Sequence, residues 1–283
     1  MAAFGIMVAC SIVYAFIPIM AKASRPCPPF LLVGLASAFE AVLSGLIAWG
    51  GGDWQMLSVT SNDTLLAILA GACVSVAGAY LVIRGYDYMP IWRHQLFILI
   101  KPLIAGFAAW IWFGEMVGWT AAPAFALMAA GLLIAFNGWG KGNWHGAHIL
   151  IGASAFYALL PVCLKIAVDV VPPFVIVSLL SAGISVLSLL LSVVFERNRW
   201  FGAWKGRFLW QLPMLGITNA LAVWLSLKGL ELLPVWQHQM ILLTKPVIAA
   251  LIARVVFTEP LTRRYVPAFL LMATGASVLI IFH

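Results

Sequence analysis

Charged residues are scarce in this chain. Asp, Glu, Lys and Arg make up 9% of its 283 residues, whereas hydrophobic residues make up 64% and the mean hydropathy is +1.06. Roughly a quarter of the residues of an ordinary soluble domain are charged, so this composition excludes a soluble domain. Apolar runs of about 20 residues recur from end to end, and each is long enough to cross a hydrocarbon core of about 30 Å. The sequence therefore predicts a polytopic integral membrane protein.

Motifs for catalytic chemistry are also missing. The sequence contains no HExxH, DxD or nucleophile-elbow pattern, so we predict neither an enzyme nor a bound cofactor. The net charge of +7 fits basic loops at a membrane surface better than a nucleic-acid partner. The first apolar run lacks a basic leader, which indicates a span and not a cleaved signal. No metal site is predicted, because the four cysteines lack metal-ligand spacing (Cys10, Cys27, Cys73 and Cys163).

Ten apolar segments are separated by glycine, proline or charged residues, and they lack the alternation of barrel strands. A segment in lipid must satisfy its backbone hydrogen bonds internally, so we predict an all-α fold with ten transmembrane helices. The expected bounds are 3–22, 30–49, 64–86, 91–113, 119–137, 147–166, 173–195, 209–227, 235–257 and 265–282.

The second half of the sequence repeats the first at a shift of 144 residues. Under this shift "WRHQLFILIKP" at 92–102 falls on "WQHQMILLTKP" at 236–246, and "PAFALMAAG" falls on "PAFLLMATG". The halves are residues 1–143 and 144–283, with five helices each. Because five crossings are an odd number, the second half must enter the membrane from the opposite side. Inverted repeats predict an alternating-access transporter with a site near the midplane; an ion channel is the competing class.

The basic residues that the repeat does not duplicate predict the orientation. They fall in the loops between helices 1 and 2, 5 and 6, 7 and 8, and 9 and 10, whereas the loops between helices 2 and 3 and between helices 4 and 5 carry acids and no Lys or Arg. The positive-inside rule places the basic loops in the cytoplasm and both termini on the non-cytoplasmic side, in a bacterial inner membrane. These residues are Arg25, Lys141, Arg197, Arg199, Lys205, Arg207, Arg263 and Arg264.

Helices 4 and 9 also carry a family resemblance. Each has a proline inside the helix (Pro102 and Pro246) and ends in "FGE" at 113–115 or "FTEPLT" at 257–262, before a glycine-bearing helix. With the 5+5 duplication, the whole chain resembles the ten-helix EamA-type carriers of the drug/metabolite transporter superfamily. The resemblance implies a transporter. Two features depart from the familiar members: their termini are cytoplasmic, and many have apolar residues at positions 101 and 245. The lysines here are more similar to those of the phosphate-handling translocator branch.

The lysines are the most informative polar residues. Lys101 and Lys245 each lie about ten residues into a predicted span, too deep to reach water easily. A buried ammonium costs at least about 2.5–3.5 kcal/mol, so each should face a cavity or a partner. A histidine seven residues earlier lies two helical turns away on the same face, about 10 Å along the axis, with a glutamine beside it. The expected substrate-binding residues are Lys101, Lys245, His94, His238, Gln95, Gln239, Trp92 and Trp236.

Two explanations of these lysines remain open. In the first, four basic side chains converge on a central cavity and bind a phosphate or carboxylate. In the second, Glu40, the only acid well inside a span, pairs with one lysine and locks the bundle. Trp92 and Trp236 stack on the substrate or anchor the helices at the interface. Coupling or gating is assigned to Glu40, Tyr14, Tyr157 and Arg93.

Three functions follow from these explanations. The first is a secondary carrier of a small phosphorylated or carboxylated metabolite. The second is a flippase for a polyprenyl phosphate or another lipid-linked phosphate, with the tail left in the bilayer. The third is an amino-acid or drug exporter, which Glu40 supports. The expected partners are the substrate, membrane lipids and protons or a counter-substrate, with the protein a monomer or homodimer.

Overall fold

The computed structural model of the chain describes residues 2–24, 27–88, 91, 100–115, 119, 122–137, 144–200, 208–258 and 266–281. In these residues the regular structure is helical, and strands are absent. The helices are α1 (Ala2–Ala23), α2 (Pro29–Gly51), α3 (Asn62–Gly85), α5 (Lys101–Phe113), α6 (Ala122–Asn137), α7 (Trp144–Val168), α8 (Pro173–Phe195), α10 (Phe208–Leu232), α11 (Val235–Ile241), α12 (Thr244–Phe257) and α13 (Val266–Ile281), with short 3₁₀ turns at η1 (Asp53–Val59) and η4 (Arg197–Arg199).

Prolines and left-handed residues set several helix ends. Pro29 and Pro173 each open a helix, where a missing backbone N–H costs nothing. Gly52 and Gly114 follow α2 and α5 with φ of 74° and 63°, the left-handed cap that glycine adopts without strain. Thr258 follows α12 at the position that repeats Gly114 and adopts φ of 52°. The two halves therefore share backbone caps even where the residue types differ.

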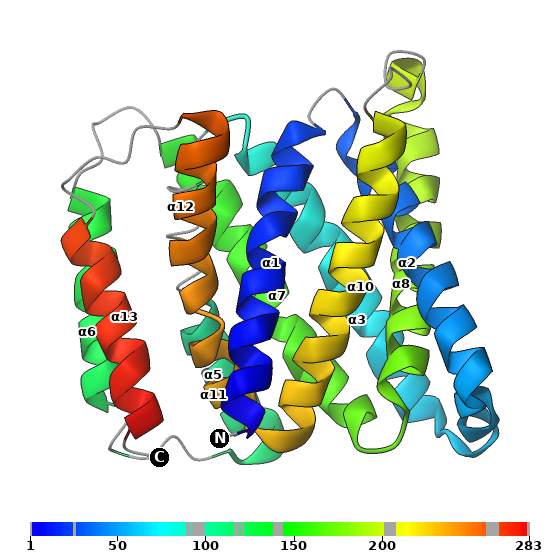
Figure 1. Cartoon of the computed structure of the whole chain (residues 1–283), viewed down its shortest axis with the longest axis horizontal. Coiled ribbons are helices and arrows are strands. Elements are labelled where there is room, and N and C mark those ends of the chain that lie inside the picture. The colour runs from blue at the N-terminus through cyan, green and yellow to red at the C-terminus, as the bar shows by residue number, and fades with distance from the viewer. Residues whose placement is uncertain are drawn as a thin grey trace.

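The helices of the two halves run in opposite directions. In Figure 1, α1 runs from the bottom to the top and its counterpart α7 runs from the top to the bottom. Both marked termini lie at the bottom, which we call the lower end; the opposite end is the upper end. Contacts between the halves occur in matched pairs, because α1 packs on α10 as α7 packs on α3, and α1 packs on α12 as α7 packs on α5.

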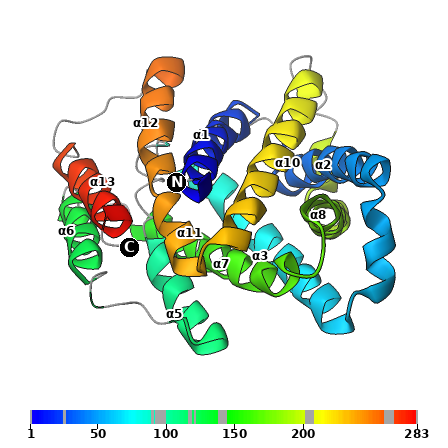
Figure 2. The same cartoon turned by 60° about the horizontal axis from the view of Figure 1, so that its bottom comes forward.

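Two helix pairs flank the central group formed by α1, α3, α5, α7, α10 and α12. Figure 2 shows α6 with α13 at one side of the molecule and α2 with α8 at the other. The α2–α8 contact is close because α2 has a glycine where α8 approaches: a Cβ added at Gly34 would lie 2.8 Å from the Leu189 side chain. Ser178 on α8 donates a hydrogen bond to the Ala41 carbonyl of α2 at 3.0 Å.

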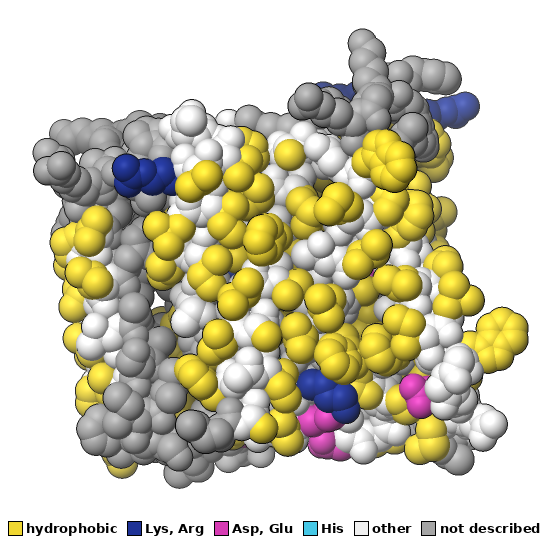
Figure 3. All heavy atoms as spheres, in the orientation of Figure 1, with side chains coloured by type: hydrophobic (Ala, Val, Ile, Leu, Met, Phe, Trp, Pro, Cys, Tyr) yellow, Lys and Arg dark blue, Asp and Glu magenta, His cyan; other side chains and the backbone are white. Residues whose placement is uncertain are grey.

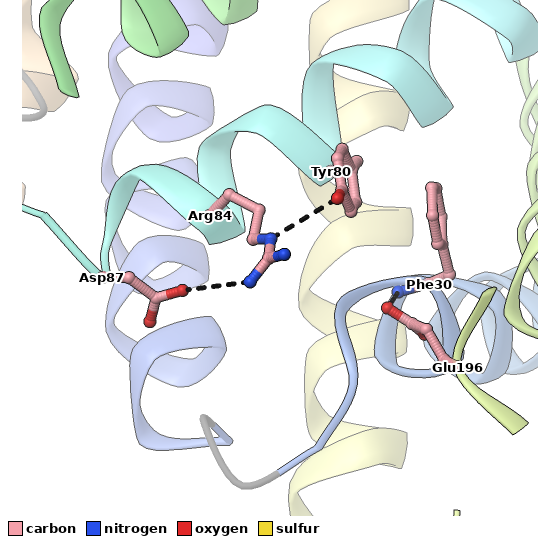
Figure 4. A network of polar contacts seen from close by, with 5 residues as sticks. All are labelled: Phe30, Tyr80, Arg84, Asp87 and Glu196. Carbon is pink, nitrogen blue, oxygen red and sulfur yellow. Dashed lines mark hydrogen bonds and ion pairs between the residues drawn. The ribbon is translucent and has the colours of Figure 1, made fainter. Parts of the chain in front are cut away.

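A cluster of contacts at the upper end joins α8, α2 and α3. The Glu196 carboxylate, after α8, accepts hydrogen bonds from the backbone N–H groups of Phe30 and Leu31 in the first turn of α2, at 3.2 and 3.1 Å. The Phe30 ring stacks on Tyr80 with centroids 4.4 Å apart, and the Arg84 guanidinium donates to the Tyr80 hydroxyl (Figure 4). A carboxylate at a helix N-terminus is favoured by the helix dipole, so Glu196 ties the first half to the second.

The outer surface is suited to lipid. Figure 3 shows hydrophobic side chains across the middle of one face and charged side chains near its upper and lower margins. Six helical segments of the described residues are long and apolar enough to cross a membrane, and two shorter apolar helices, 101–113 and 122–131, accompany them. The six are Ala2–Ala23, Pro29–Gly51, Asn62–Gly85, His148–Val168, Pro173–Phe195 and Val235–Phe257.

The structure differs from the predicted helices mainly in the ninth. We expected one continuous helix over 235–257, but the chain makes a turn at Leu242 and Leu243 between α11 and α12. Most of the other bounds agree to within a few residues; α10 continues to Leu232, five residues beyond the prediction. Most of the first part of the fourth predicted helix, 92–99, lies outside the described residues.

Candidate functional site

A cavity of about 220 Å³ lies between the two halves. Its walls are mostly apolar side chains, with a small set of polar groups among them. Helices of both halves contribute, so the cavity lies where an inverted-repeat transporter places its site. The polar and aromatic lining residues used below are Tyr14, Glu40, Ser75, Lys101, Tyr157, Asn219, Ser226, Gln239 and Lys245.

Both lysines predicted to bind substrate line this cavity. Lys101 opens α5 and Lys245 is the second residue of α12. The Lys101 ammonium lies over the Tyr157 ring at 4.6 Å, and the Lys245 ammonium lies over the Tyr14 ring at 4.9 Å. Each contact crosses from one half of the chain to the other. In the described part of the chain neither ammonium forms an ion pair.

The buried carboxylate of the cavity is paired with an amide. Glu40 is 1% exposed, and its Oε2 accepts a hydrogen bond from Asn219 Nδ2 at 2.6 Å. The expected alternative, an ion pair between Glu40 and a lysine, is not formed among the described residues. Glu40 therefore presents a carboxylate to the cavity from α2, held in place from α10.

A glycine sets the spacing of α10 and α2 at this pair. A Cβ added to Gly216 would lie 2.7 Å from the Ala36 carbonyl oxygen and 3.3 Å from the Glu40 backbone nitrogen. Only a residue without a side chain allows the two backbones to approach so closely. Asn219 lies about one turn after Gly216. The close approach thus explains why the Asn219 amide reaches Glu40.

His238 and Gln239 lie differently with respect to the cavity. Gln239 lines the cavity, whereas His238 is absent from the lining and is fully buried behind it. His238 Nε2 lies 2.9 Å from the Ser226 hydroxyl, and its Nδ1 lies 3.0 Å from Gln239 Nε2. The turn at 242–243 interrupts the helix between His238 and Lys245, so the seven-residue spacing does not by itself fix their relative direction. That His238 binds substrate stays a prediction.

Trp236 is likewise placed away from the cavity. It is 3% exposed and absent from the lining, and its Cβ lies 3.5 Å from where a Cβ on Gly106 of α5 would be. Trp236 packs in the described structure between α11 and α5, and its predicted role at the substrate or at the interface stays a prediction. Four predicted site residues lie outside the described residues: Trp92, Arg93, His94 and Gln95.

Hydrogen bonds near the lower end lie on either side of the α10–α11 connection. The two carboxylate oxygens of Glu115, after α5, share the hydrogen of the Val235 backbone N–H, at 2.9 and 3.2 Å, and so cap α11 from the other half. Lys165 Nζ donates to the Leu230 carbonyl at 2.7 Å and joins α7 to α10. Leu164 and Leu230 line the cavity beside this contact.

Several polar lining residues were not predicted, among them Ser75, Asn219 and Ser226. Single serines and asparagines inside apolar helices carry little information by themselves. Alignment of the two halves identifies them, since Asn219 repeats Ser75 and Ser226 repeats Val82. A polar residue at one of two equivalent positions in a span is a change that hydrocarbon alone does not favour.

Comparison with known proteins agrees with this architecture. A solved structure described as "Crystal structure of protein" superposes with a TM-score of 0.77 over 99% of this chain and 98% of the other, at 17% sequence identity. That likeness concerns the fold. No curated protein matches the sequence.

The fold and the family together define the class. An all-helical, two-repeat chain with apolar spans is a multi-pass membrane protein of the transporter type. The sequence matches the EamA-like transporter family over residues 1–137 and again over 144–281, and the chain belongs to that family, within the drug/metabolite transporter superfamily.

Proposed function

We propose that this protein is a secondary transporter that carries a small anion, a phosphorylated or carboxylated metabolite. The observation that supports it is the meeting of Lys101 and Lys245 in one cavity between the halves. Each ammonium rests on a tyrosine ring, and neither is neutralised by a carboxylate of the described residues.

The energetics favour an anionic ligand. Placing an ammonium in a membrane span costs at least about 2.5–3.5 kcal/mol. A cation–π contact returns about 0.5–2 kcal/mol, which leaves part of the cost uncompensated. Oxygens of a phosphate or carboxylate accept charge-assisted hydrogen bonds from both lysines and from the Gln239 amide. An anion therefore offsets what the rings alone do not.

Transport follows by alternating access, with residues 1–143 and 144–283 as the two moving units. Carboxylate caps cross between these units at both ends, Glu196 to α2 at the upper end and Glu115 to α11 at the lower end. Opening one end requires the cap there to loosen while the other holds. We assign gating to Tyr14 and Tyr157, which hold the lysines between the units, and coupling to Glu40.

The charges of the described residues support an orientation with the upper end in the cytoplasm. Cations dominate there and acids dominate the lower end, so both termini face the non-cytoplasmic side of a bacterial inner membrane. The upper-end residues are Lys22, Arg84, Arg197, Arg199 and Arg254 with Asp87 and Glu196; the lower-end residues are Asp53, Asp63, Glu115, Asp169 and Glu231 with Lys165 and Lys228.

A second candidate is an exporter of amino acids. The Glu40 carboxylate lines the same cavity as the two lysines, so a zwitterion finds a partner for each of its charges. In this function the lysines bind the substrate carboxylate and Glu40 accepts from its ammonium group.

A thermal-shift screen of the purified protein separates these functions. The panel contains inorganic phosphate, citrate, leucine and undecaprenyl phosphate. Stabilisation by phosphate or citrate supports the anion carrier, stabilisation by leucine alone supports the exporter, and stabilisation by the lipid alone supports a flippase. No response of the wild-type protein to either phosphate or citrate contradicts the anion carrier.

A further inference from the structure

The Ser226 hydroxyl lies at one end of a hydrogen-bond chain of three side chains. Ser226 and Gln239 line the cavity, and His238 joins them from behind. Gln239 Nε2 lies 3.0 Å from His238 Nδ1, and the Ser226 oxygen lies 2.9 Å from His238 Nε2. These hydrogen bonds join α10 and α11 of the second half. The position on α3 that repeats Ser226 is Val82, which has no hydroxyl.

The chemistry of the Gln239 amide sets the donor and acceptor of each hydrogen bond in this series. The amide nitrogen of glutamine carries two hydrogens and only donates, so His238 Nδ1 must accept. A neutral imidazole that accepts at Nδ1 carries its hydrogen on Nε2 and donates it to the Ser226 oxygen. The Ser226 hydrogen is then available to another acceptor. The Tyr14 hydroxyl, also in the cavity lining, is hydrogen-bonded to the Ser226 side chain, and a bound anion would replace it as the acceptor.

We propose that Ser226 is a substrate-contacting residue that donates its hydroxyl hydrogen to the bound anion, and that His238 is the positioning residue that directs it. The inference rests on the anion-carrier function proposed above. Lys101 and Lys245 supply charge from both halves, and Ser226 adds a directed neutral donor from one half only. The anion is therefore held in a single orientation.

Inorganic phosphate binding to the purified protein tests the contact. Ser226→Ala should weaken phosphate binding about tenfold, the loss of one hydrogen bond to a charged acceptor, while Ser226→Thr, which keeps the hydroxyl, should stay within about twofold.

The tautomer of His238 gives a readout that does not depend on any ligand. Selective ¹⁵N-histidine labelling, with His238→Gln to assign the resonance, should show the hydrogen on Nε2. A hydrogen on Nδ1, or equal phosphate affinity of wild type and Ser226→Ala, overturns this inference and leaves the anion carrier standing. If the wild-type protein binds neither phosphate nor citrate, the anion-carrier function is contradicted, and the proposed contact of Ser226 with the anion is contradicted as well.

Discussion

The cavity faces of α3 and α10 occupy equivalent places in the two halves and differ in polarity. Asn219 and Ser226 line the cavity from α10, whereas the equivalent residues of α3 are Ser75 and Val82. The partner of Asn219 differs in the same way, since Glu40 on α2 is repeated by Ile184 on α8. The buried Ser75 hydroxyl has no hydrogen-bond partner among the described residues. The α10 side of the cavity thus carries more hydrogen-bonded polar groups than the α3 side.

The features that the halves share are of another kind. Each half supplies a lysine that rests on a tyrosine of the other half. Each also stacks an aromatic pair near an end, Phe30 with Tyr80 and Phe174 with Trp224. In the proposed carrier, the shared lysine–tyrosine contacts serve both the opening and the closing of each end. The polar groups present in one half only set the orientation of the substrate.

Removing the shared charges should have the largest effect. Lys101→Ala and Lys245→Ala should each weaken binding of phosphate or citrate by about 10- to 100-fold, the loss of a charge-assisted contact, and the double variant should abolish it. Equal losses are expected because the lysines are equivalent. Isothermal titration with detergent-purified, monodisperse protein measures the change, with Lys→Arg variants as charge-preserving controls. A double variant that binds normally would contradict the site.

Replacing Glu40 by the residue at the equivalent position of the second half should destabilise the protein. Glu40→Ile copies Ile184 and leaves the Asn219 amide without its acceptor, at a cost of about 1–3 kcal/mol. Glu40→Gln, which keeps an acceptor oxygen, should lose less. Thermal unfolding in detergent measures both, and equal stability of wild type and Glu40→Ile would show that the pair contributes nothing.

Widening the α2–α10 contact should have a comparable or smaller effect. Gly216→Ala forces a Cβ to within 2.7 Å of the Ala36 carbonyl, and such overpacking costs about 1–3 kcal/mol. Gly5→Ala is the matched control, since a Cβ there meets nothing within 4 Å. The unfolding temperature should fall for the first variant only. A fall of the same size in both would contradict the close approach.

Replacing the rings under the lysines should cost less. Tyr14→Leu and Tyr157→Leu each remove a cation–π contact worth about 0.5–2 kcal/mol, while Tyr→Phe keeps it. The two sites should respond alike, because both contacts cross between the halves. Thermal unfolding at neutral pH provides the measurement, and a Phe variant as unstable as Leu would assign the effect to the hydroxyl group.

The smallest effect concerns the equivalent caps of α5 and α12. Thr258→Gly should stabilise the protein by up to about 1 kcal/mol, because the left-handed conformation is unfavourable for a residue with a side chain. Gly114→Ala should destabilise it by a similar amount. Thermal unfolding of both variants gives the comparison, and stabilisation by Gly114→Ala would exclude the left-handed cap.

Much of this fold could be predicted from the sequence. Composition and the 144-residue repeat predicted an all-helical membrane protein of two repeats, which the fold and the family confirm, and depth in the spans selected Lys101 and Lys245. The positions of His238 and Trp236 relative to the cavity could not be predicted, because helical periodicity assumes a continuous helix and the turn at 242–243 breaks it. The Asn219–Glu40 contact depends on which helices approach at Gly216, which no local pattern encodes. That the lysines bind substrate stays a prediction.

The crossed placement of lysine and tyrosine constrains the history of the duplicated gene. A substitution at Tyr14 alters the surroundings of Lys245 in the other copy, and a substitution at Tyr157 alters those of Lys101. Neither copy can diverge at these positions without the other responding. A single copy expressed alone would keep its lysine but lose the ring beneath it, unless a second copy packed against it in the opposite orientation.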